Sequence, residues 1–142
     1  RAAASSGRLA RFVPEPSRHV AERIARARDH RLQLLGAEPG PKGAVDAWVI
    51  GHTGNVYDVR LGALVECSCA DFAKSRSACK HLLFVLLRAL GVPEGDARVW
   101  QRALLPQELR ELRDRLQRRR AAGELEALLA PEAARAAFAA AG

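Results

Sequence analysis

Cys67-Ser68-Cys69-Ala70-Asp71-Phe72-Ala73-Lys74-Ser75-Arg76-Ser77-Ala78-Cys79-Lys80-His81 contains all three cysteines of the chain and one of its four histidines. The sulfur and nitrogen donors follow the order Cys-x-Cys, nine residues, Cys-x-His. Structural zinc sites take four such ligands in a tetrahedron. The stretch therefore predicts one structural zinc ion held by Cys67, Cys69, Cys79 and His81.

The spacing of the donors also predicts the local structure. Side chains two apart on an extended segment lie on the same side, so Cys67 and Cys69 suit the end of a strand. On a helix the same spacing would turn Cys79 and His81 roughly 200° apart, because each residue advances about 100°. We therefore expect Cys79 just before a helix and His81 in its first turn. The apolar run 82–87 that follows fits this helix.

The segments before and after that helix also have predictable structure. Residues 70–78 form a predicted polar loop, in which Phe72 is the one large apolar side chain and would lie beneath the metal. Gly91 is placed to end the helix.

The same residues allow other interpretations. Free cysteines are often small buried hydrophobic residues, so a chance grouping of three thiols and a core histidine is one alternative. A disulfide is another, but Cys-x-Cys is a poor bridge geometry and would leave an odd cysteine. His52 would replace His81 only if the helix register were different. His19 and His30 flank the first predicted helix and are expected at the surface.

The ligand pattern resembles the SWIM zinc finger, a ββα module. Similarity to the subset of SWIM proteins in which a RING domain follows, acting as E3 ubiquitin ligases, extends over roughly residues 18–113. It is carried by the upstream segments 21–27 and 31–35, by Thr53-Gly54-Asn55-Val56-Tyr57, and by the segments 90–93, 99–101 and 103–105 after the site. The resemblance implies a protein-interaction module that binds a substrate or partner.

Composition sets broad limits on the chain. Its 142 residues suffice for one compact domain with tails, and no run of about 18 apolar residues predicts a membrane span. The chain begins at Arg1 and contains no methionine, so we take it as a fragment of a longer protein. The net charge of +7 permits contact with nucleic acid or with acidic proteins. Only three of the 23 basic residues are lysines, a bias that a GC-rich coding sequence also produces.

The patterns predict an α+β fold, a small antiparallel β-meander plus helix flanked by N- and C-terminal helices. Strands are expected at 31–35, 45–50, 55–61 and 64–67, with a loop at 36–43. Helices are expected after the caps Ser17 and Asp96 and from Pro106, whose leucine face at 106–116 lies opposite a solvated, mixed-charge face. We divide the chain into a flexible lead-in (1–16), a SWIM-type zinc-finger domain with flanking helices (17–105) and a helical, alanine-rich C-terminal extension (106–142).

Three functions are compatible with these features. The first is a zinc-binding interaction module of an E3 ubiquitin ligase whose RING lies outside this chain, with a protein partner or ubiquitination substrate. The second is a nucleic-acid-binding finger that places Lys74, Arg76 and Lys80 against phosphate. The third is a structural subunit of a larger complex that uses the leucine face. The chain itself shows no catalytic residues and no small-molecule site, and we expect it to be intracellular, in the cytoplasm or nucleus.

Overall fold

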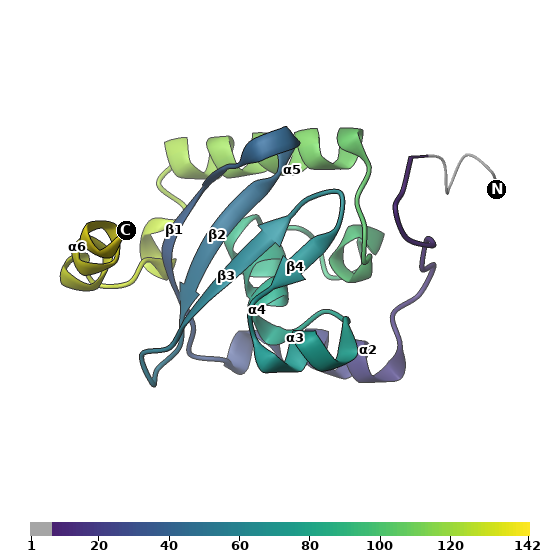
Figure 1. Cartoon of the computed structure of the whole chain (residues 1–142), viewed down its shortest axis with the longest axis horizontal. Helices are drawn as coiled ribbons and strands as arrows, with labels where there is room; N and C mark the ends of the chain where they lie inside the picture. Colours follow the sequence, from purple (N-terminus) through teal and green to yellow (C-terminus); the bar gives the residue numbers. More distant parts are fainter. Residues whose placement is uncertain (1–6) are drawn as a thin grey trace.

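The computed structural model describes residues 7–142, and Figure 1 shows the labels of its helices and strands. Four antiparallel strands form one sheet, in which the order of the strands is also their order along the chain. The strands are β1 (Gln33–Pro39), β2 (Val45–Ile50), β3 (Val56–Leu61) and β4 (Val65–Cys67). The predicted meander and the α+β class are therefore confirmed.

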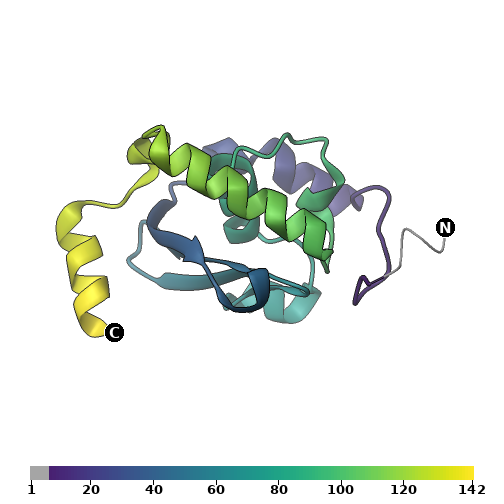
Figure 2. The ribbon, with the colours of Figure 1, turned by 90° about the horizontal axis from the view of Figure 1, so that it is seen from above.

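The helical elements form the second part of the fold. They are α2 (Arg18–Ala25), η1 (Ala27–Asp29), η2 (Pro41–Gly43), α3 (Ala70–Ser75), α4 (Lys80–Leu83), η3 (Phe84–Ala89), η4 (Ala97–Trp100), α5 (Pro106–Ala121), η5 (Glu126–Leu128) and α6 (Glu132–Ala141). Two perpendicular views show α4 and α5 on one side of the sheet (Figures 1 and 2). In agreement, α4 contacts β3 and β4, while α5 contacts β1 and β2.

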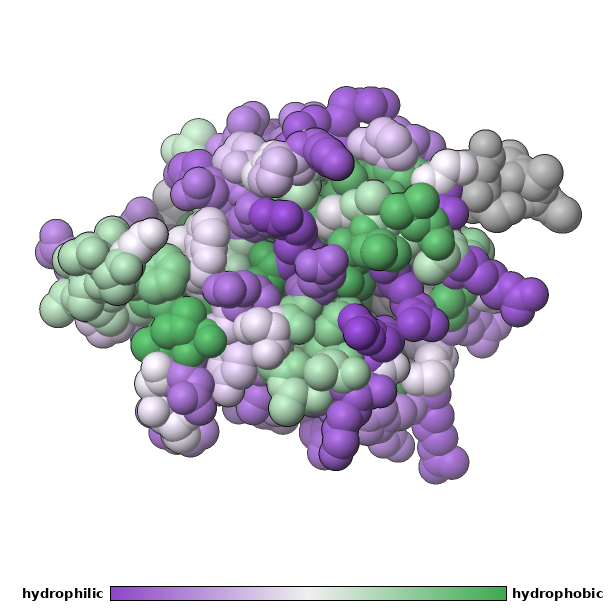
Figure 3. Space-filling view, viewed as in Figure 1, coloured by the Kyte–Doolittle hydropathy of each residue, from purple (hydrophilic) through white to green (hydrophobic). Residues whose placement is uncertain are grey.

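The alternation of residues in β2 explains which face of the sheet is covered. Val45, Ala47 and Val49 are buried toward the helices, whereas Asp46 and Trp48 between them are half-buried on the other face. This is the period of two expected of a strand with one solvated face. On that face Arg60 of β3 forms an ion pair with Asp46, and Figure 3 shows many hydrophilic side chains on the same side of the molecule.

The prediction of a loop at 36–43 is wrong for the first half of that segment. β1 continues to Pro39 because Glu38 and Pro39 pair with β2, after a register shift between Leu34 and Gly36. Glycine and proline weaken a central strand, but an edge strand and a bulge tolerate both.

The predicted polar loop at 70–78 also contains regular structure. Its first six residues form α3, because the sulfur of Cys69 accepts a hydrogen bond from the backbone N–H of Phe72 and caps the helix. The helix after the ligands begins where predicted, after Cys79, but its α-helical part is short. From Phe84 to Ala89 it continues as a π-helix, and Gly91 follows with a positive φ of 68°.

The central helix α4–η3 is buried, and arginines from α5 bind its C-terminal end. Arg119 donates to the carbonyl oxygens of Ala89 (2.7 Å) and Arg88 (3.0 Å), and Arg115 donates to that of Gly91 (3.1 Å). Cationic donors stabilise the unpaired carbonyls at a helix C-terminus. The prediction of a solvated, mixed-charge face on α5 is therefore wrong for Arg115.

The leucine face of α5 lies in the core of the chain itself. Leu109, Leu112 and Leu116 are buried in the same hydrophobic cluster as the central helix. The expectation that the face at 106–116 serves another subunit is therefore wrong, since the sheet and the central helix already cover these side chains.

Both terminal segments contact the body of the fold. In the N-terminal segment Val13 accepts hydrogen bonds from the Nε1 atom of Trp100 (2.9 Å) and from Gln101 (2.7 Å). Near the C-terminus, the ring of Phe138 in α6 lies 5.9 Å from that of Trp48 in β2. Residues 1–6 of the predicted lead-in lie outside the described residues, and the domain division stays a prediction. None of the helices in residues 7–142 combines the length and apolar character that crossing a bilayer requires.

Candidate metal centre

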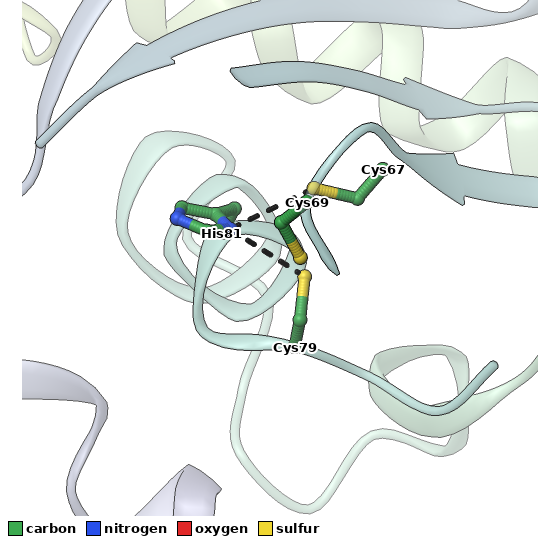
Figure 4. A group of neighbouring side chains, drawn as sticks. All are labelled: Cys67, Cys69, Cys79 and His81. Atoms are coloured by element: carbon green, nitrogen blue, oxygen red, sulfur yellow. Dashed lines mark hydrogen bonds between the residues drawn. The ribbon is translucent and has the colours of Figure 1, made fainter. Parts of the chain in front are cut away.

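The four predicted ligands come together from three elements (Figure 4). Cys67 ends β4, Cys69 caps α3, Cys79 caps α4, and His81 lies in the first turn of α4. All four residues are buried, and their donor atoms lie within 4.8 Å of one another. The position of Cys79 before the helix and of His81 in its first turn is as the spacing predicts.

The distances between donor atoms suit a tetrahedral zinc ion. The Nδ1 atom of His81 lies 3.6 Å from the sulfur of Cys67 and 3.8 Å from that of Cys79. Zn–S bonds of about 2.3 Å and Zn–N bonds of about 2.0 Å in a tetrahedron separate sulfur and nitrogen by about 3.5 Å. The residues are thus positioned to bind one zinc ion, with Nδ1 as the histidine donor.

Backbone N–H groups support the sulfur atoms. Besides the bond from Phe72 to Cys69 (3.3 Å), the N–H of Leu82 donates to the sulfur of Cys79 at 3.5 Å. Hydrogen bonds of this kind favour the thiolate, which is the form that binds metal. Each of the two helices therefore begins at a sulfur atom and stabilises its negative charge.

The protonation of the three thiols also points to a cation. Hydrogen bonding with Cys67, and then with His81, lowers the pKa of Cys79 to about 4. The same hydrogen bond with Cys79, and then burial, raises the pKa of Cys67, while burial raises that of Cys69. In a buried cluster, one thiolate thus disfavours deprotonation of the other two thiols. A divalent cation offsets this repulsion because it attracts all three thiolates. The donor set fits zinc.

His81 is held by an aromatic contact. Its ring stacks on that of Tyr57 in β3, with centroids 3.9 Å apart and planes inclined by 23°. The second ring nitrogen, Nε2, is buried and has no hydrogen-bond partner within residues 7–142. An acceptor for this nitrogen is expected of a metal-bound histidine, but no side chain or carbonyl of the described chain supplies it.

The remaining histidines lie outside the cluster. His52 is exposed in the turn between β2 and β3, and His19 is exposed on α2. His30 follows η1 and is half-buried. Phe72 is buried in the same hydrophobic cluster as Cys69 and Cys79. The alternative with His52 as the fourth ligand is therefore not supported.

Two residues at the site lie in segments that resemble the family, but no spacing or residue pattern assigns either of them a role. Tyr57 looks like an ordinary strand residue, and Arg23 looks like part of a solvated helix surface. In the structure Arg23 donates to the carbonyl oxygen of Ala78 (2.8 Å) and pairs with Asp71 at 2.8 Å. Because Ala78 precedes Cys79, Arg23 attaches α2 directly to the segment between the two ligand pairs.

Comparison with known proteins agrees with this geometry. Residues 57–90 match the family described as SWIM zinc finger. The chain is 31% identical over 101 residues to the E3 ubiquitin-protein ligase Zswim2 of Mus musculus. The aligned region covers 69% of this chain and 16% of that protein. The chain therefore spans about a sixth of the length of this relative. No solved structure matches the chain.

Proposed function

Because this chain contains a SWIM zinc finger, we propose that it is the substrate- or partner-binding part of an E3 ubiquitin ligase, with Cys67, Cys69, Cys79 and His81 as the ligands of one zinc ion. The observation that carries this proposal is the extent of similarity to the mouse ligase, which covers 101 residues and so exceeds the finger at 57–90. The similarity between the two proteins therefore extends beyond the finger itself.

The role of the metal in this proposal is structural. Three thiolates and one imidazole complete a tetrahedral shell, so a zinc ion there supplies folding energy and no open position for a reacting water. The protein residues hold the end of β4 against the starts of α3 and α4. Ubiquitin transfer is assigned to a RING domain outside this chain, because a RING needs about eight Cys or His ligands and all three cysteines are already used.

A fusion experiment tests the interaction role. The chain is linked to an active RING domain from another ligase, and proteins captured by the purified chain serve as substrates in a reaction with E1, E2 and ubiquitin. We expect the fusion to modify a captured protein faster than the RING domain alone. His81→Gln should abolish the gain, and His52→Gln, which changes an exposed histidine, should not. Equal rates with and without the chain would refute the proposal.

A nucleic-acid-binding finger is a second candidate, favoured by the exposure of Lys74, Arg76 and Lys80 around the ligands. In that case the DNA-binding constant should fall about tenfold for each phosphate contacted when the salt concentration rises tenfold. Fluorescence anisotropy with a labelled duplex measures this slope. Absence of binding at low salt would eliminate the candidate.

The chemistry of the site suits a reducing compartment. Thiolates remain available to zinc where cysteines stay reduced, which is the condition of the cytoplasm and nucleus. We therefore place the finger in one of these compartments.

A further inference from the structure

A pocket of about 540 Å³ lies between the N-terminal helical segment and the metal centre. Its walls come from α2 and η1 on one side and from the starts of α3 and α4 on the other. The lining includes Arg26, Asp29, His30, Tyr57, Lys80 and His81. The volume falls in the range of about 300–1,000 Å³ typical of ligand sites.

His81 lines this pocket and carries a buried donor. Its Nδ1 atom faces the sulfurs of Cys67 and Cys79, so Nε2 carries the hydrogen when Nδ1 binds zinc. Figure 4 shows the second nitrogen on the side of the ring away from those sulfurs. The residue is 3% exposed and lines the pocket, and Nε2 has no acceptor within residues 7–142. A buried donor of this kind requires an acceptor.

The charges around the pocket favour a single negative charge on the ligand. Arg23 and Asp71 also line it, but they neutralise each other through their ion pair. Arg26 and Lys80 are exposed and have no ion-pair partner in the described chain, and Asp29 offsets one of them. Burial, followed by the charge of Lys80, lowers the pKa of His30, so this imidazole is neutral at pH 7. The lining side chains other than the metal ligands thus carry a net charge of about +1, and three thiolates around one Zn²⁺ add −1. The site as a whole is near neutral, and the positive charge that is available to a ligand lies at Arg26 and Lys80.

We infer that this pocket binds one carboxylate, from an aspartate or glutamate side chain in an acidic segment of a partner protein. The carboxylate accepts the hydrogen of His81 Nε2 and pairs with Lys80 and Arg26. The ring of Tyr57 offers an apolar surface to the methylene groups that carry the carboxylate. A phosphate dianion is disfavoured, because Asp29 and the three thiolates of the metal centre repel its second charge. The inference rests on the proposed function only in taking a protein as the ligand.

The site also explains why α2 belongs with the finger. Arg26 lies just after α2, and Arg23 fixes that helix to Ala78 and Asp71 beside the ligands. The finger supplies the donor and one cation, and the upstream helix supplies the other cation. Binding of the acidic segment therefore requires both parts of the chain.

An NMR titration of the zinc-loaded full chain tests the inference. The probes are capped hexaglutamate, capped hexaglutamine and inorganic phosphate. We expect hexaglutamate to bind and to shift the ¹H–¹⁵N signal of His81 Nε2–H downfield, with no response to hexaglutamine. The inference is overturned if the Nε2–H signal does not move, or if phosphate binds more tightly than hexaglutamate.

Charge-reversal variants locate the binding site. Lys80→Glu and Arg26→Glu should each weaken hexaglutamate binding about tenfold or more, because each removes a charged hydrogen-bond partner. Lys74→Glu makes the same charge change on an exposed residue of α3 outside the pocket and should alter affinity less than about twofold. Arg26 is not adjacent to a ligand in sequence, so its variant retains zinc even if Lys80→Glu does not. Equal weakening by all three variants would overturn the inference.

The failure of this inference differs from failure of the proposed function. If Arg26→Glu still binds a captured protein partner unchanged, the pocket is not the binding site but the interaction role stands. If hexaglutamate binds as expected while the RING fusion modifies no captured protein, the ligase role fails and the carboxylate site stands.

Discussion

Removing zinc should destabilise the chain strongly but locally. The donor atoms of all four ligands converge within 4.8 Å, so zinc binds the folded chain and not the unfolded one. At free zinc of about 1,000 times Kd, the ion contributes about 4 kcal/mol to stability. A chain of this size loses about 3 °C in Tm per kcal/mol, so a strong chelator should lower Tm by about 12 °C.

The structure also predicts where the apo chain opens. Among the described residues, α3 has Phe72 as its only buried side chain and one ion pair, Asp71 with Arg23, whereas α5 is buried in the core through three leucines. Residues 67–81 should therefore lose protection from hydrogen exchange before the rest of the chain.

Circular dichroism melts with and without the chelator measure the first effect, and hydrogen exchange measures the second. Cys69→Ser and His81→Gln should reproduce the loss of Tm in the presence of zinc, and His52→Gln provides the matched control. An unchanged melt with a strong chelator, or equal effects of the two histidine variants, would refute the role assigned to the metal.

Further outcomes follow from the packing and charges. Arg119→Ala should lower the free energy of unfolding by about 2 kcal/mol in urea titrations, because it removes two charged hydrogen bonds from the end of the central helix. Leu112→Ala should cost about 2–5 kcal/mol since this side chain is fully buried, while exposed Leu64→Ala should change stability by less than about 0.5 kcal/mol; a similar cost for both would contradict the packing. Hydrogen bonding from Arg98 lowers the pKa of Asp96, so the stabilisation from this pair is complete above the unfolded-state pKa near 4 and disappears as pH falls through the folded value. Unfolding free energies at pH 5 and pH 3 should therefore differ less for Arg98→Met than for wild type, and an equal pH dependence would exclude this contribution.

The metal centre was predictable because its signals are short-range. Cys67 and Cys69, and then Cys79 and His81, have spacings that limit which local structures can bring their donors together. The cap at Ser17 was predictable for the same reason, and its hydroxyl accepts from Val20 as expected. Each of these features depends on residues a few positions apart.

The parts that were missed depend on contacts between distant segments. Arg119 binds carbonyl oxygens 30 and 31 positions earlier, and no spacing marks such a pair. Arg23 likewise reaches Ala78 across 55 positions. Gly36 and Pro39 disfavour a strand locally, but pairing with β2 outweighs that preference. The start of α3 was missed because sulfur is not among the usual cap acceptors.

The contacts of the two tryptophans make the chain its own optical probe. Trp48 lies against Phe138 and Trp100 donates to Val13, so each indole senses a different end of the polypeptide. With Trp48→Phe the emission of Trp100 would report attachment of the N-terminal segment, and with Trp100→Phe that of Trp48 would report the last helix. Detachment of either end can thus be followed separately, without an added dye.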